Sequence, residues 1–118
     1  MYREELTIKR MVEEELSKIC FGRKYLGFKY LTDSIVIVYF DRDRLKNLNK
    51  DVYSIIAQKY NSKERSIKSA INRATEIMYY DCDEKVLKEF LGENKELKKP
   101  KTKEIIKRVI YYVEKKAK

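Results

Sequence analysis

The chain has 118 residues, of which 43% are hydrophobic, so it has the length of one domain and enough apolar content for a single core. Its 28 lysine and arginine residues outnumber its 19 aspartate and glutamate residues, which gives a formal net charge of +9, and there is no histidine. This excess of positive charge favours a polyanionic partner, and the lack of histidine, of a glycine-rich phosphate loop and of a nucleophile beside a recognisable base argues against an enzyme.

The cysteines and the apolar runs exclude further classes. Cys20 and Cys82 lie far apart and have no C-x-x-C partner, so they indicate neither a zinc site nor a disulfide framework. The chain does not open with the pattern of a signal peptide, and its longest apolar run, Ile35 to Phe40, is too short to span a bilayer. We therefore expect a cytoplasmic protein without a metal or a cofactor.

The first predicted element is an amphipathic helix over residues 2–20. Its apolar stripe consists of Leu6, Met11, Val12, Leu16, Ile19 and Cys20, and the remaining surface carries Glu4, Glu5, Glu13, Glu14 and Glu15. Because carboxylates repel phosphates, this helix is expected to cover the core on a side turned away from a polyanion.

The second predicted element covers Tyr25 to Asp41. The run from Ile35 to Phe40 is rich in β-branched and aromatic residues, so taken alone it also fits a buried strand. The length of the whole segment, the absence of a central turn signal and the helical pattern elsewhere favour a helix. Gly27 weakens this prediction, since glycine is a poor helix former.

A polar connector follows from Asp41 to Lys50, and its leucines, Leu45 and Leu48, are expected to turn into the core. Asp41 and Asp43 have the spacing of a hard-cation site. Because arginines flank both aspartates, local neutralisation is the favoured interpretation.

Residues 51–80 have the pattern of two helices joined by a tight corner, Tyr60 to Ser62, which is a helix-turn-helix layout. The inward positions recur at helical spacing: Val52, Ile55, Ile56, Ala57 and Tyr60 in the first helix, and Ile67, Ala70, Ile71, Ala74 and Ile77 in the second. The outward positions of the second helix are Lys63, Glu64, Arg65, Lys68, Ser69, Asn72 and Arg73. Most are residue types that bind phosphates or base edges in a major groove.

The helix-turn-helix geometry assigns roles to these polar residues, because its second helix lies in the major groove. The predicted base-reading residues are Lys68, Ser69 and Asn72. The predicted contacts to the DNA backbone are Asn61, Ser62, Lys63, Arg65 and Arg73. Two alternatives stay open: Asn61 and Glu64 have the spacing of a capping pair, and a charged helix face is often only a solvated one.

The remaining residues predict two more helices. An acidic turn from Asp81 to Glu84 precedes a short helix marked by Val86, Leu87, Phe90 and Leu91, which Gly92 ends. After a loop, Thr102 is the expected N-cap of a last helix, with Glu104 in its first turn. Its inward residues are Ile105, Ile106, Val109, Ile110 and Val113, and its outer face carries Lys103, Lys107, Arg108, Lys115 and Lys116.

The chain resembles the C-terminal effector domain of the stage zero sporulation protein A family. The resembling segments are GFKYLTDSIVIVY (27–39), DVYSIIAQKYN (51–61), AINRATEI (70–77), Leu91 with Gly92, and PKTKEII (100–106). The resemblance implies an all-α fold of about six helices around one core, with the segment 35–40 helical. It also implies binding of double-stranded DNA, often as tandem copies on adjacent sites, and a contact of residues 81–93 with an RNA polymerase sigma factor.

Two departures qualify what the resemblance implies. The family has an acidic residue and two arginines where this chain has Lys68, Ser69 and Asn72, so the DNA target is expected to differ. Family members also carry an N-terminal receiver domain, whereas residues 1–118 are expected to form a single effector domain without one. The leading hypothesis is a sequence-specific DNA-binding transcription regulator. The alternative is a protein-interaction module that pairs with a full-length regulator or with RNA polymerase without reading DNA.

Overall fold

The computed structural model describes residues 2–19, 22, 24–92 and 98–117, and all regular elements among them are helical. The helices are α1 (Tyr2–Lys18), α2 (Leu26–Phe40), α3 (Ser54–Lys59), α4 (Glu64–Asp81), α5 (Glu84–Leu91) and α6 (Thr102–Ala117). A 3₁₀-helix, η1 (Arg42–Asn47), and a π-helical turn, η2 (Asn49–Tyr53), connect α2 to α3. The all-α prediction is confirmed, including the helical state of residues 35–40.

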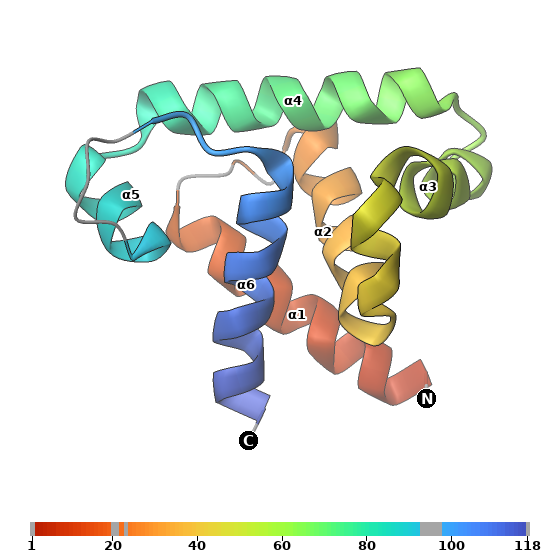
Figure 1. Cartoon of the computed structure of the whole chain (residues 1–118), viewed down its shortest axis with the longest axis horizontal. Helices are drawn as coiled ribbons and strands as arrows, with labels where there is room; N and C mark the ends of the chain where they lie inside the picture. The colour runs from red at the N-terminus through yellow and green to blue at the C-terminus, as the bar shows by residue number, and fades with distance from the viewer. Residues whose placement is uncertain (1, 20–21, 23, 93–97, 118) are drawn as a thin grey trace.

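The long helix α4 lies across one end of the molecule, and α2 and α6 run away from it toward α1 (Figure 1). Helix α3 lies below one end of α4 and α5 below the other. The α2 helix is central because α1, α3, α4 and α6 all pack against it. Its side chains Leu31, Ile35 and Val38 are fully buried, which explains why its sequence is apolar on most sides.

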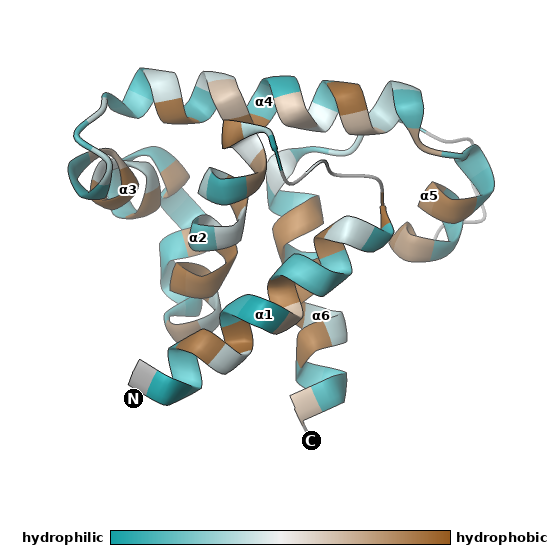
Figure 2. Cartoon of the chain, turned by 180° about the vertical axis from the view of Figure 1, so that it is seen from behind, coloured by the Kyte–Doolittle hydropathy of each residue, from teal (hydrophilic) through white to brown (hydrophobic). Residues whose placement is uncertain are grey.

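The inward faces of α4 and α6 follow the predicted spacing. Ile67, Ile71 and Ala74 are buried in α4, where hydrophobic and hydrophilic segments alternate along the ribbon (Figure 2), while Ala70 and Ile77 are only partly buried. All five predicted inward residues of α6 are buried. In the connector, Leu48 is buried and Leu45 is half-buried.

Three predictions of burial are wrong. Leu6 is 42% exposed because Ile8 takes the inward position of α1, in line with Val12. Ile55 is 39% exposed because Tyr53 packs inward instead. Glu15, predicted on the outer acidic face, is only 3% exposed; it lies on the same side of α1 as the core residues and forms ion pairs with Lys18 and Lys116. Cys20, predicted to be apolar and inward, lies outside the described residues.

The ends of α5 and α6 show how local chemistry fixes helix boundaries. Asp83 caps α5 by accepting a hydrogen bond from the backbone N–H of Lys85, and Gly92 ends α5 in a left-handed conformation, as predicted. Arg108 of α6 donates to the carbonyl of Leu91, directly beneath this glycine. Thr102, the expected N-cap of α6, is instead the first residue of the helix. Lys101 precedes the helix, and its backbone N–H donates a hydrogen bond to the Glu104 carboxylate.

Candidate nucleic-acid interface

The position of α4 is set by a close approach between backbones. A Cβ atom on Gly27 of α2 would lie 2.3 Å from the carbonyl oxygen of Ala70 and 2.5 Å from the Cβ of Ala74. The glycine that weakened the helix prediction is therefore the residue that lets α4 rest on α2. The small alanines on the facing side of α4 complete this contact.

The corner between α3 and α4 depends on Asn61. This residue has a φ of 53°, in the left-handed region that asparagine tolerates better than most residues. The backbone N–H of Ser62 donates to the carbonyl of Ala57 at 2.8 Å, so Asn61 terminates α3 in the manner of a Schellman motif. The alternative in which Asn61 and Glu64 cap α4 is wrong, because Lys63 occupies the N-cap position without a side-chain capping bond.

A buried carboxylate supports the same corner from below. Asp33 of α2 accepts hydrogen bonds from the hydroxyl of Tyr60 and, at 3.2 Å, from the Nζ of Lys59. The pKa of Tyr60 is raised well above its usual range, mainly by burial. The hydrogen bond to Asp33 and the negative charge of Asp33 act in the same direction. The ring of Tyr60 also packs against Tyr30 and lies under the ammonium group of Lys29.

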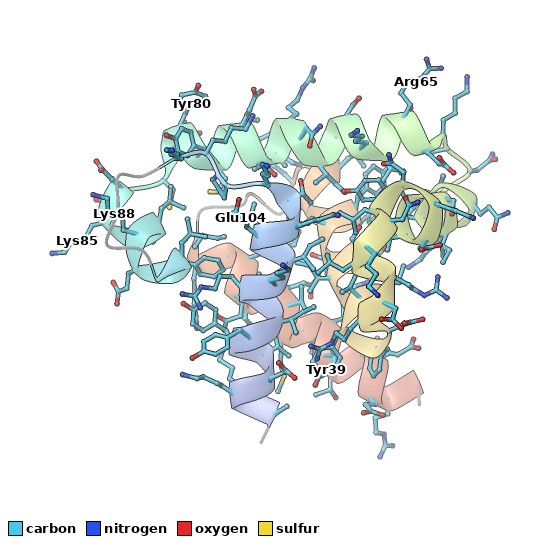
Figure 3. The ribbon with its side chains drawn as sticks, viewed as in Figure 1. Tyr39, Arg65, Tyr80, Lys85, Lys88 and Glu104 are labelled. Carbon is cyan, nitrogen blue, oxygen red and sulfur yellow. The ribbon has the colours of Figure 1, made fainter. Side chains whose placement is uncertain are left out.

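The residues predicted to contact DNA are all exposed, and they share one end of the molecule. They are Asn61, Ser62, Lys63, Arg65, Lys68, Ser69, Asn72 and Arg73. Arg65 points away from the protein body (Figure 3). The side chains of the corner and of the outer face of α4 are thus available to a partner that approaches from this end.

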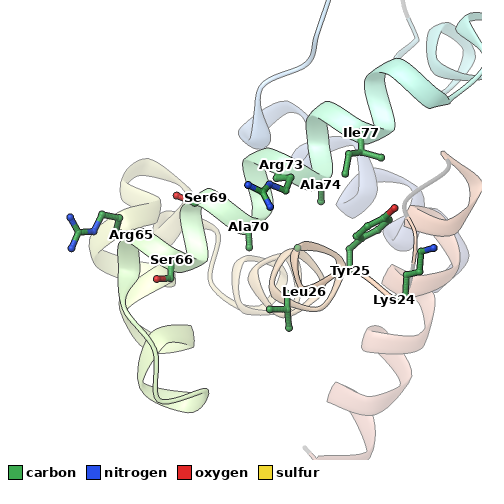
Figure 4. Close-up of a pocket in the computed structure, with 11 residues that line it drawn as sticks. Lys24, Tyr25, Leu26, Arg65, Ser66, Ser69, Ala70, Arg73, Ala74 and Ile77 are labelled. Carbon is green, nitrogen blue, oxygen red and sulfur yellow. The ribbon is translucent and has the colours of Figure 1, made fainter.

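The structure divides the outer face of α4 between two surface hollows. The α2-side hollow has a volume of about 500 Å³, and Arg65, Ser69 and Arg73 of α4 are among the residues that line it (Figure 4). The α6-side hollow has a volume of about 280 Å³ and receives Lys68 and Asn72. The predicted base-reading residues therefore do not form one cluster, since Ser69 lies at one hollow and Lys68 and Asn72 lie at the other.

Three lysines from outside α4 also line these hollows, and the sequence pattern did not assign them to the interface. Lys24, just before α2, lines the α2-side hollow, and Lys101 and Lys103, at the start of α6, line the α6-side hollow. They are about 30 to 50 residues away from the α4 positions that they accompany. The only sequence signal was the basic outer face of the last helix, which included Lys103.

The floor of the α6-side hollow contains a buried tyrosine. Burial raises the pKa of Tyr53 to about 12, and a hydrogen bond with Thr102 acts in the opposite direction. This contact joins η2 to the first residue of α6, which lies between Lys101 and Lys103.

The outer face of α4 also carries two carboxylates. Glu64 lies in the first turn of α4, where the helix dipole stabilises a negative charge. Glu76 pairs with Lys99 at 3.2 Å. This ion pair offsets the charge of Glu76 and connects α4 to the segment that leads into α6.

Comparison with protein families decides the assignment. Residues 12–113 match the family described as sporulation initiation factor Spo0A C terminal. The chain belongs to this family. Membership makes it, at the family level, a Spo0A-like DNA-binding effector domain, and it implies roles in transcription regulation and sporulation. The comparison with curated proteins found no match.

The matched residues include α4 and all four lysines that line the two hollows, Lys24, Lys68, Lys101 and Lys103. Within the described residues, no group of three or more metal-ligating side chains comes together, and Asp41 and Asp43 pair with Arg44 and Lys46. None of the described helices is long and apolar enough to cross a bilayer. Cys82 is buried.

Proposed function

We propose that this Spo0A C-terminal family member is a sequence-specific regulator of transcription that inserts α4 into the major groove of double-stranded DNA. The observation that carries the proposal is the exposed outer face of α4, which rests on α2 through the close contact at Gly27. A helix fixed in this way presents its side chains in one geometry, which sequence discrimination requires. We place this function in the cytoplasm, in one domain of 118 residues.

The roles of the α4 residues follow from their chemistry. Lys68 donates to guanine acceptors, Asn72 binds adenine through two hydrogen bonds, and Ser69 bonds to either base, with about 1–3 kcal/mol of discrimination for each good bidentate contact. Lys63, Arg65 and Arg73, together with Asn61 and Ser62 at the corner, bind the DNA backbone. These contacts position α4 but carry no sequence information.

Selection of bound duplexes from a random library tests the proposal directly. We expect one enriched sequence, and we expect Lys68→Ala or Asn72→Ala to relax the preference at particular base pairs. Arg65→Ala and Arg73→Ala should weaken binding to all duplexes by a similar factor. Arg10→Ala, on the exposed surface of α1, is the matched control and should change neither property.

A selection without enrichment, combined with no binding of any duplex at low ionic strength, would contradict the proposal. The protein-interaction alternative would then take its place, and size-exclusion chromatography with a full-length regulator or RNA polymerase would test it.

Two partner contacts belong to the same proposal. Tandem copies on adjacent DNA sites would place two chains side by side on one duplex. A sigma factor of RNA polymerase would contact residues 81–93, of which α5 extends beyond the C-terminal end of α4 with Lys85 and Lys88 on its surface (Figure 3). Charge reversal at Lys85 should impair activated transcription without changing DNA affinity.

A further inference from the structure

The two hollows that flank α4 have the same unusual charge composition. Lys24, Arg65 and Arg73 line the α2-side hollow, and the α6-side hollow is lined by three lysines, Lys68, Lys101 and Lys103. No carboxylate belongs to the described residues that line either of them. Positive charges gathered without a counterion repel one another, so an anion bound in each hollow would lower the electrostatic free energy.

Two other hollows among the described residues have a different composition. The hollow between α1, α2 and α3 contains Glu5 and Asp33 beside its lysines, and the hollow near α5 contains Glu15 and Glu89. The positive charge of the chain is therefore unbalanced next to α4 and locally balanced in these more distant places. Lysine by itself does not distinguish the four hollows, because each contains at least one. They differ in whether carboxylates are present beside the lysines.

Two of the three lysines outside α4 make side-chain contacts with neighbouring groups. The ammonium group of Lys24 lies over the ring of Tyr25, 5.5 Å from its centre. The Nζ of Lys103 donates to the carbonyl of Lys46 at 3.4 Å. In the described part of the chain, Lys24, Lys101 and Lys103 form no ion pair, so their charges are available to a ligand.

An ion pair between Lys99 and Glu76 connects the segment before α6 to α4. Pro100, which is buried, restricts the backbone immediately before Lys101. Figure 1 shows this segment passing beside α4 before it turns into α6. Lys101 and Lys103 therefore follow directly on a segment that contacts α4, and they line the same hollow as Lys68 and Asn72.

We propose that the two hollows bind the two phosphodiester backbones that border the major groove, one DNA strand on each side of α4. Lys24 binds phosphates of one strand, and Lys101 and Lys103 bind phosphates of the other. The inference rests on the proposed function, because a helix inserted in a major groove about 12 Å wide has one backbone on either side of it. It adds two further elements, the segment before α2 and the start of α6, to the DNA contact.

The salt dependence of DNA binding tests the contribution of these lysines. With a mixed-sequence 20-base-pair duplex, each lost phosphate contact should reduce the slope of log K against log salt by about 0.9. We expect Lys24→Gln to remove about one contact and Lys101→Gln/Lys103→Gln about two. The charge-matched control is Arg3→Gln/Arg10→Gln, which changes two exposed residues of α1 and should leave the slope almost unchanged.

The assignment to opposite strands requires a second measurement. Methylphosphonate groups, which are uncharged, would replace single phosphates in a duplex recovered by selection. Positions at which the replacement weakens the wild-type protein but not Lys24→Gln should lie on one strand. Positions that become insensitive in Lys101→Gln/Lys103→Gln should lie on the other strand.

The outcomes separate this inference from the proposed function. If the wild-type protein binds no duplex, both fail. If it binds DNA but the lysine variants keep the wild-type salt slope, or if both sets of positions lie on one strand, only the present inference is overturned. Circular dichroism of each variant confirms that it is folded, and because the three lysines are exposed we expect wild-type spectra.

Discussion

The contact between α2 and α4 and the contact between α1 and α6 are built from different interactions. At the first, Gly27 allows the backbone of α4 to approach α2 directly, and no long side chain separates them. At the second, ion pairs accompany the apolar core: the Nζ of Lys116 lies 2.6 Å from the carboxylate of Glu15 and 3.7 Å from that of Glu14. Long side chains can adjust to a small displacement, whereas a backbone contact cannot. The helix proposed to read DNA is therefore placed by the less adaptable of the two contacts.

The largest effect is expected from Gly27→Val, which adds a branched side chain at the α2–α4 contact. The new atoms would overlap the backbone of Ala70, so α4 must move or the helices must separate. We expect destabilisation by about 3 kcal/mol, at the upper end of the range for overpacking, measured by urea unfolding. Leu26→Val, at the exposed neighbouring position, is the control; an equal effect of both changes would show that the close contact is unimportant.

A smaller loss is expected from Tyr60→Phe, which removes one hydrogen-bond donor from Asp33 under the α3–α4 corner. The buried carboxylate keeps only its contact with Lys59. The unfolding free energy should fall by about 1–2 kcal/mol. Because the pKa of Tyr60 is raised in the folded protein, the wild-type contribution should be complete below the ordinary tyrosine pKa and decrease as the pH rises above it. A Tyr60→Phe difference that persists unchanged in strong alkali would contradict this assignment.

The smallest effect is expected at the α1–α6 contact, from Glu15→Gln. Burial by itself raises the pKa of Glu15, but hydrogen bonds and charge interactions with Lys116 and Lys18 outweigh it, so the pKa is lowered. The stabilisation should be present above the ordinary glutamate pKa and lost as the pH falls through the lowered value. We expect a difference of about 1 kcal/mol near neutral pH, because the lysines are partly exposed, and a smaller difference at an acidic pH below the ordinary glutamate pKa. Urea unfolding at both pH values checks this, and a pH-independent difference would argue against an ionic contact.

The apolar spacing of the sequence predicted most of the fold because helical periodicity reports which face is buried. It correctly separated the inner residues Ile67 and Ile71 of α4 from the outer residues Lys68 and Asn72. It failed at Glu15, since the counter charge that makes burial tolerable, Lys116, lies about 100 residues away in the sequence. Periodicity contains no information about such a distant partner.

The candidate site was predictable only where one helix supplies its residues. The exposed residues of α4 were identified from their spacing, but Lys24 and Lys101 reach the same surface through the packing of α2 and α6. From the local sequence, Gly27 is only a poor helix former in α2. Its close contact with the backbone of Ala70 depends on the packing of α4, which the local sequence does not reveal. The assignment of individual side chains to bases or phosphates stays a prediction.

At the junction of α5 and α6, the residue at position 92 restricts which residue fits at position 108. Gly92 has a φ of 69°, and a Cβ atom there would lie 1.6 Å from a guanidinium nitrogen of Arg108. Replacement of the glycine alone would expel the arginine and free the Leu91 carbonyl that it bonds. A shorter residue at position 108 would remove the clash but not the backbone strain. The two substitutions should thus be non-additive in a double-mutant cycle, and related sequences that abandon the glycine are expected to abandon the arginine as well.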